Sequence, residues 1–215
     1  MNKALMGLVA ALALLTTSAF TVGFAEEFKV GIDYDVINPP QPTDDPDKIE
    51  VREFFWYGCP HCYHFEPDLN AWIKKKPASV NFIRQPAVFN EHWAAHAKAF
   101  FTADVLGVLD KLHPEFYDAI QNKKETLESE DDLAKFFNAH GVAEEDFHKA
   151  YQSFAVDSKL RHASGLAAKY GITGTPALVV NGKYVVSPGK AKSFPRMIEI
   201  TNELIKQESV SGAKK

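Results

Sequence analysis

The chain has 215 residues, of which 46% are hydrophobic, and its formal net charge at pH 7 is −4. This acidic balance argues against a nucleic-acid-binding protein, which would carry a basic stripe, and we interpret it as a solubility feature. The length suits one domain, or one domain that carries an insertion. With two cysteines, the chain has too few for a small scaffold held by several disulfides.

Residues 1–25 have the pattern of a cleaved secretory signal. Lys3 supplies a positive start, residues 4–15 are apolar, and small residues precede a cut after Ala25, with a cut after Ala19 as the alternative. The apolar run is shorter than the about 20 residues that a membrane-spanning helix needs. We therefore expect a signal peptide rather than an anchor, and an exported protein in an oxidising compartment.

The next part of the chain predicts two strands around one helix. Residues 28–37 alternate loosely and suggest a first strand, and the proline-rich residues 38–47 form a loop. Residues 48–57 are β-branched and aromatic, which predicts a buried strand, and residues 79–85 alternate as a further strand. Between them, apolar spacing predicts a helix over about 59–76, with Pro60 at the favoured first position.

A long helical region follows, over about residues 91–162. Ser129 with Asp132 resembles a capping box that begins a helix, and a shorter helix is expected after Pro114. We expect the aromatic residues at helical spacing to form a core. They are Trp93, Phe100, Phe101, Phe116, Tyr117, Phe136, Phe137, Phe147, Tyr151 and Phe154.

The last part of the chain returns to strands. A helix from about Leu160 ends at Gly171, and residues 177–180 and 184–186 flank a two-residue hairpin turn of the Asn-Gly type. Ser193 is expected to cap a final helix, and residues 209–215 are expected to fray.

The only two cysteines lie in the sequence Cys59-Pro60-His61-Cys62, where a predicted strand gives way to a predicted helix. The nucleophile of disulfide exchange is a thiolate, and the free N–H groups at a helix N-terminus stabilise an anion. We therefore expect Cys59 to attack, or to be attacked, and the more buried Cys62 to resolve. His61 can add a positive charge or a hydrogen bond to the thiolate.

A metal site is the alternative interpretation of the cysteine pair. Structural zinc takes four ligands, and the chain has no second Cys-x-x-Cys set. His61 and His64 could contribute, but they lie within one helical turn of the cysteines. His92 and His96 have helical spacing without the glutamate of a metalloprotease motif. We therefore predict that the chain holds no metal and needs no bound cofactor.

A second motif is Thr175-Pro176, directly before a predicted apolar strand. A cis bond there would let the turn stand against the cysteines and offer the Thr175 backbone to an extended substrate chain. An ordinary turn proline is the alternative.

Together these segments resemble the DsbA family of bacterial periplasmic thiol:disulfide oxidoreductases. The resemblance rests on two blocks, Glu53-Phe54-Phe55-x-x-x-Cys59-Pro60-His61-Cys62-Tyr63-x-Phe65-Glu66 and Gly174-Thr175-Pro176-Ala177 followed by Val180-Asn181-Gly182-Lys183-Tyr184. It implies an α/β thioredoxin fold with an inserted all-helical domain. The implied thioredoxin-like domain comprises residues 26–89 and 163–215, and the inserted domain residues 90–162.

The same resemblance implies the roles of the site residues. Cys59 is the exposed nucleophile, Cys62 its disulfide partner and Pro176 the cis-proline. Glu53 is a buried acid that can relay a proton as Cys62 ionises, with Arg84 as the basic neighbour that the family often shows. Thr175 departs from the valine that the best-known members carry, and this leaves the strength of the oxidant open.

We expect a monomeric periplasmic oxidase that acts on reduced exported polypeptides. The resemblance further implies that a membrane DsbB-type, quinone-linked partner reoxidises it. A disulfide isomerase or reductase that works from the dithiol form is the alternative, although the segment before the active-site strand is too short for a dimerisation domain. A peptide-binding, chaperone-like module with structural cysteines is a third interpretation. It predicts that Cys59→Ser keeps full activity.

Overall fold

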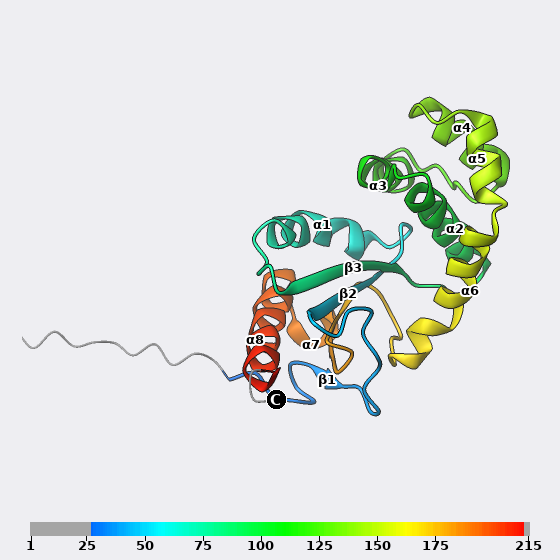
Figure 1. Ribbon diagram of the computed structural model, residues 1–215. Coiled ribbons are helices and arrows are strands. Elements are labelled where there is room, and N and C mark those ends of the chain that lie inside the picture. Colours follow the sequence, from blue (N-terminus) through cyan, green and yellow to red (C-terminus); the bar gives the residue numbers. More distant parts are fainter. Residues whose placement is uncertain (1–26, 213–215) are drawn as a thin grey trace, which may run out of the picture.

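The computed structural model describes residues 27–212, so the predicted signal peptide lies outside the described residues. A five-stranded sheet forms one part of the molecule, with the strand order β1-β5-β4-β2-β3 (Figure 1). Its strands are β1 (Asp35–Val36), β2 (Ile49–Phe55), β3 (Val80–Pro86), β4 (Ala177–Val180) and β5 (Tyr184–Val186).

Strand β2 lies inside the sheet, parallel to β3 and antiparallel to β4. Its sequence IEVREFF is buried at every position after Ile49, which is typical of a strand covered on both faces. The chain leaves β2, forms a helix and returns in the parallel β3. This crossover places the cysteine motif at the carboxyl end of β2, where the helix begins.

Helices cover the sheet and extend it at one end. They are α1 (Pro60–Ile73), α2 (Glu91–Val105), α3 (Leu109–Tyr117), the π-helix η1 (Asp118–Asn122), α4 (Glu130–Ala139), α5 (Glu144–Tyr151), α6 (Phe154–Lys169), α7 (Pro188–Ala191) and α8 (Phe194–Gly212). Figure 1 shows α2 to α5 gathered at one end of the molecule, away from α8, while α6 runs back toward the sheet. Among residues 27–212, no helix is long and apolar enough to cross a bilayer.

The two predicted central strands, the hairpin and the capped helices are confirmed. Ser129 Oγ accepts the backbone N–H of Asp132 and begins α4. Asn181 and Gly182 both have positive φ, of 51° and 65°, as a tight two-residue hairpin turn requires.

The predicted first strand over residues 28–37 is wrong, because the chain pairs as a strand only at Asp35–Val36. The carboxylate of Asp33 accepts the backbone N–H of Lys29, and Gly31 adopts a φ of 80°. These features fold residues 29–34 into a turn, which removes them from the sheet.

The predicted start of the helix after Pro114 is also wrong. Helix α3 begins at Leu109 and carries Pro114 inside it, because its inward face is held by buried packing at Leu112, His113, Phe116 and Tyr117. The chain then widens into η1, in which the N–H of Lys123 donates to the carbonyl of Asp118. Such π-helical turns occur often at functional sites.

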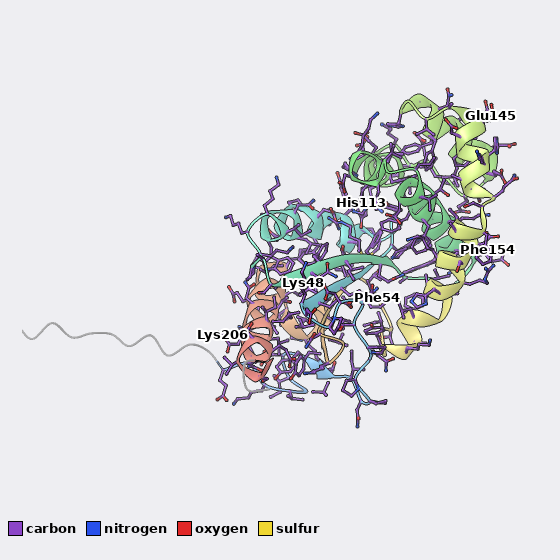
Figure 2. The ribbon with its side chains drawn as sticks, viewed as in Figure 1. Lys48, Phe54, His113, Glu145, Phe154 and Lys206 are labelled. Carbon is purple, nitrogen blue, oxygen red and sulfur yellow. The ribbon has the colours of Figure 1, made fainter. Side chains whose placement is uncertain are left out.

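Two further expectations fail at helix ends. Phe154, expected in the core, is 80% exposed, because Ser153 caps α6 and turns this first-turn residue toward solvent. Figure 2 labels Phe154 on α6. Residues 209–212 are helical rather than frayed, and the rest of that expectation, residues 213–215, lies outside the described residues. Buried Glu208 anchors this end of α8 by accepting hydrogen bonds from Asn181 and Lys183 of the hairpin.

The aromatic core of the helical part depends on Phe137, which is fully buried and packs against Phe116 and Phe147 at ring distances of 5.7 and 4.8 Å. Phe137→Ala should lower the free energy of unfolding by about 3–5 kcal/mol, measured by urea denaturation. The matched control, Phe154→Ala, removes an exposed ring and should change it by less than about 1 kcal/mol. Equal losses in both variants would contradict this assignment of the core.

Candidate active site

Cys59 is the N-cap residue of α1, with extended backbone angles φ −89° and ψ 113°. A tight turn joins it to β2, in which the N–H of Cys59 donates to the carbonyl of Trp56 at 3.0 Å. The indole of Trp56 lies over Gly58, so a Cβ at Gly58 would come within 2.2 Å of the ring. Only glycine fits there, and the turn therefore delivers the Cys59 sulfur to the helix N-terminus.

Both cysteines are free thiols, and the structure therefore describes the dithiol form. The pKa of Cys59 is lowered to about 5 by a hydrogen bond from Cys62, assisted by the Thr175 side chain and by the backbone N–H groups of Cys62 and His61. These donors outweigh burial, which acts in the opposite direction. At neutral pH the Cys59 sulfur is therefore a thiolate.

The expectation of an exposed Cys59 needs correction, because the residue is only 8% exposed. The loop before β4 covers it, and the Cys59 sulfur lies 3.4 Å from the carbonyl oxygen of Thr175. Access to the sulfur is therefore limited to a narrow approach beside this loop.

Cys62 lies one helical turn inside and is completely buried. Burial raises its pKa well above the ordinary value, and the nearby charges of Cys59 and Glu53 raise it further. The two sulfurs of one motif thus differ widely in acidity: Cys59 ionises easily and Cys62 resists ionisation.

The Thr175–Pro176 peptide bond is cis. A pocket of about 310 Å³ lies beside it and is lined by His61, Thr175 and Pro176, together with the end of the loop before β4 and the segment 187–189. The structure thus brings the two sequence motifs together around the Cys59 sulfur, although they are more than a hundred residues apart in the chain.

Behind the cysteines lies a buried ionic cluster. Glu53, predicted as a buried acid, has no exposed surface, and its Oε2 accepts a hydrogen bond from Arg84 Nη1 at 2.7 Å. The same Arg84 nitrogen donates to Glu66 Oε1 at 2.7 Å, and Nη2 donates to Asn70. Glu66 was not predicted as a site residue, although its position four residues after Cys62, on the same helix face, points to it.

The two carboxyls of this cluster do not ionise together. Burial raises the pKa of Glu53 to about 8, despite the attraction of Arg84. Burial acts on Glu66 in the same direction, but His113 and Arg84 outweigh it and lower the pKa of Glu66. At pH 7 the cluster therefore pairs Arg84 with an ionised Glu66, and Glu53 keeps its proton.

The helical part of the molecule reaches this cluster through His113 of α3. His113 Nδ1 lies 2.8 Å from the Tyr57 hydroxyl, and Nε2 lies 3.5 Å from Glu66 Oε1. Figure 2 labels His113 where α3 approaches the rest of the molecule. No sequence pattern links residue 113 with the cysteine motif, so its place could not be predicted.

The π-helix η1 holds both sides of the cysteine motif. Gln121 Nε2 donates to the carbonyl of Tyr57 at 2.7 Å, and Asn122 Nδ2 donates to the hydroxyl of Tyr63 at 2.9 Å. The backbone just before Cys59 and the side chain just after Cys62 are therefore positioned by the helical part.

The profile of the family described as "DSBA-like thioredoxin domain" matches residues 50–194. This chain belongs to the DsbA family. It is 40% identical over 207 residues to the "Thiol:disulfide interchange protein DsbA" of Pseudomonas syringae pv. tomato, which covers 95% of this chain and 97% of the relative. The protein of that name from Azotobacter vinelandii is 40% identical over 214 residues, covering 97% of this chain and 98% of the relative.

Solved DsbA structures have the same fold. The crystal structure of Pseudomonas aeruginosa DsbA superposes with a TM-score of 0.83 at 39% identity, covering 87% of this chain and 97% of the other. The oxidoreductase DsbA of Xylella fastidiosa superposes with a TM-score of 0.79 at 35% identity, covering 85% and 98%. This chain is thus a thiol:disulfide oxidoreductase with a thioredoxin fold that carries a helical insertion.

Two of the histidines considered for a metal site, His92 and His96, have other partners. His92 Nδ1 lies 2.8 Å from Glu128 Oε2, and His96 Nε2 lies 2.7 Å from the carbonyl of Thr126. Within residues 27–212, no group of three or more His, Cys, Asp or Glu side chains is arranged to hold a metal ion.

The acidity of Cys59 predicts a pH-dependent stability. The thiolate absorbance of the reduced protein should titrate with a midpoint near pH 5, and this titration should be absent in Cys59→Ser. Because an unfolded cysteine has a pKa of about 8.5, the stabilisation from Cys59 is complete above that pH and is lost as the pH falls through about 5.

Comparison of the two redox forms isolates this contribution, because the oxidised form has no thiol to titrate. The free energy of unfolding of the dithiol form, relative to the disulfide form, should therefore decrease steadily from pH 8.5 to pH 5. A difference that stays constant over this range would contradict the assigned pKa.

Proposed function

We propose that this protein oxidises thiol pairs of newly exported polypeptides by donating the Cys59–Cys62 disulfide through a mixed disulfide on Cys59. The observation that carries the proposal is the unequal acidity of the two sulfurs, with the pKa of Cys59 at about 5 and that of Cys62 raised far above the ordinary value.

The reaction proceeds in two exchanges. A substrate thiolate attacks the Cys59 sulfur, the Cys59–Cys62 bond breaks, and Cys62 leaves as a thiolate that takes up a proton. A second substrate thiolate then attacks the substrate sulfur of the mixed disulfide, and Cys59 leaves as a stable thiolate. The substrate gains a disulfide and loses two electrons, which the enzyme holds as the Cys59 thiolate and the Cys62 thiol.

The direction of the reaction follows from the stability of the Cys59 thiolate. Every donor that lowers the pKa of Cys59 stabilises the thiolate of the dithiol form. The disulfide form has no thiolate and is not stabilised in this way. The disulfide is therefore a strong oxidant, which favours the oxidase over the isomerase or reductase alternative.

Glu53 supplies the proton that Cys62 needs. With a pKa of about 8 it is protonated at pH 7, and its Oε2 is held by Arg84, so the proton resides on Oε1. We propose that this proton passes to Cys62 when the disulfide opens and returns when Cys62 must attack during reoxidation.

The loop before β4 holds the substrate next to Cys59. The Thr175 backbone offers hydrogen-bonding groups to an extended chain, and Pro176 and His61 line the adjacent pocket. The Thr175 side chain also lowers the pKa of Cys59, so its exchange for valine would change the redox equilibrium.

We further propose that residues 1–25 direct export to the periplasm and are then cleaved off. We also propose that a DsbB-type quinone-linked membrane partner reoxidises the protein, and that the protein is a monomer. The proposed domain division keeps residues 26–89 and 163–215 in the thioredoxin-like domain and residues 90–162 in the insertion. Helix α6 runs across the second boundary and joins the two parts.

The first test is the redox equilibrium of Cys59 and Cys62 against glutathione, with both forms trapped by alkylation. An equilibrium well toward the dithiol, together with complete loss of thiol oxidation in Cys59→Ser, is the expected result. An equilibrium toward the disulfide would mean a reductant or a structural bridge. Full activity of Cys59→Ser would support the chaperone-like alternative instead.

The proton relay predicts the behaviour of Glu53→Gln. The amide fills the same space but cannot transfer a proton, so exchange should slow by up to about 100-fold. Glu208→Gln is the matched control, because Glu208 is also a buried carboxyl but accepts its hydrogen bonds from Asn181 and Lys183 of the hairpin. Unchanged exchange in Glu53→Gln would contradict the relay.

The same variant has a pH-dependent effect on stability. The folded pKa of Glu53, about 8, lies above the unfolded value of about 4.3, so the native state binds its proton more tightly. That contribution is complete below about pH 4 and is lost as the pH rises through 8. Glu53→Gln should therefore gain stability, relative to the parent protein, between pH 4 and pH 8.

A further inference from the structure

Tyr117 is the last residue of α3, at the point where the chain passes into η1. It is 1% exposed and belongs to the core cluster that contains Cys59 and Cys62. Its ring contacts connect it to the residues flanking the active site. The ring centres of Tyr57, His113, Tyr63 and Phe55 lie 5.0, 5.2, 5.9 and 6.3 Å from that of Tyr117.

The hydroxyl of Tyr117 is buried, and among the described residues it has no hydrogen-bond partner in this dithiol form. Glu53 Oε1, the oxygen assigned the relayed proton, is in the same condition. A buried hydroxyl without a partner destabilises a protein, and phenylalanine would fill the same space without that penalty. A role elsewhere in the reaction cycle would account for the hydroxyl.

The Cys62 sulfur lies in the same buried core cluster as the Tyr117 ring. Titratable groups face Tyr117 from every element packed around it, and after burial it is the charge of Cys62 that raises the pKa of Tyr117 most. The others are Glu53 and Tyr57 from β2 and the following turn, Glu66 from α1, Arg84 from β3, and His113 from α3.

We infer that the Tyr117 hydroxyl donates a hydrogen bond to the Cys62 sulfur while that sulfur carries negative charge, and so lowers the barrier to opening and closing the Cys59–Cys62 bond. This inference rests on the proposed function. In the disulfide and in the dithiol Cys62 is neutral and a weak acceptor, whereas the departing or attacking thiolate is a strong one.

Tyr117 and Glu53 have different tasks in this arrangement. The pKa of Tyr117 lies well above its usual value because of burial, so the hydroxyl keeps its proton and can only share it. Glu53 titrates near pH 8 and can release its proton completely. Tyr117 therefore holds the charge on Cys62 during the step in which Glu53 moves the proton.

An interaction made only during the reaction affects rates and leaves the equilibrium alone. The exchange rate depends on how readily the leaving thiolate forms, so loss of the donor slows opening. Formation of the Cys59–Cys62 bond requires the same Cys62 thiolate, so its rate falls by the same factor. A structural role for the hydroxyl would instead change the stability or the redox equilibrium.

The experiment compares Tyr117→Phe with the parent protein, both full chain. Stopped-flow measurements follow reduction of the disulfide by dithiothreitol and oxidation of the dithiol by oxidised glutathione. We expect both rates to fall by about tenfold, as for one hydrogen bond to a charged group, with an unchanged glutathione equilibrium. The rate of dithiol oxidation increases with pH as Cys62 ionises, and this increase should move to higher pH in the variant because the Cys62 thiolate has lost a donor. The Cys59 titration should stay near pH 5.

Tyr170→Phe is the matched control, because Tyr170 is also a buried tyrosine but its hydroxyl donates to the carbonyl of Pro42 in another core cluster. It should leave both rates unchanged. Rates of Tyr117→Phe within about twofold of the parent, or a shifted glutathione equilibrium, would overturn the inference. Failure of the proposed function is separate, since it would appear in the parent protein as an equilibrium toward the disulfide.

Discussion

The active site depends on a difference in pKa between two sulfurs that lie within one helical turn. Cys59 receives hydrogen bonds from Cys62, from Thr175 and from the backbone at the start of α1, whereas Cys62 is buried among apolar and acidic neighbours. This asymmetry needs a glycine turn after β2, a helix that begins at Pro60 and a cis-proline loop brought in from β4. Each part of the fold around the site serves to maintain this difference.

The buried cluster behind the sulfurs contains one arginine and two carboxyl groups. One arginine cannot neutralise two carboxylates in a dry interior, so Arg84 pairs with Glu66 and Glu53 stays neutral. In the proposed reaction this neutral acid donates its proton to the Cys62 thiolate and, once ionised, accepts it back. The thioredoxin-like part alone does not complete this cluster, because His113 comes from the helical insertion.

The sequence predicted those features that lie close together in the chain. Cys59, Cys62 and the start of α1 follow from local rules of helix ends and thiol chemistry, and the resemblance supplied Glu53 and Pro176. Residues 28–37 and Phe154 were misassigned because side-chain hydrogen bonds at Asp33 and Ser153 overrode a hydrophobic pattern. His113 and Tyr117 were beyond prediction as site residues, because their contacts with the site form only when α3 packs against β2 and α1.

The π-helix gives the insertion a mechanical consequence. Gln121 donates a hydrogen bond to Tyr57, before the cysteine motif, and Asn122 donates one to Tyr63, after it. The insertion therefore positions the motif from both sides. The position of η1 therefore bears directly on the carbonyl two residues before Cys59. An insertion without this wider turn would leave the Tyr57 carbonyl without its amide donor, and the backbone before Cys59 would lose this contact.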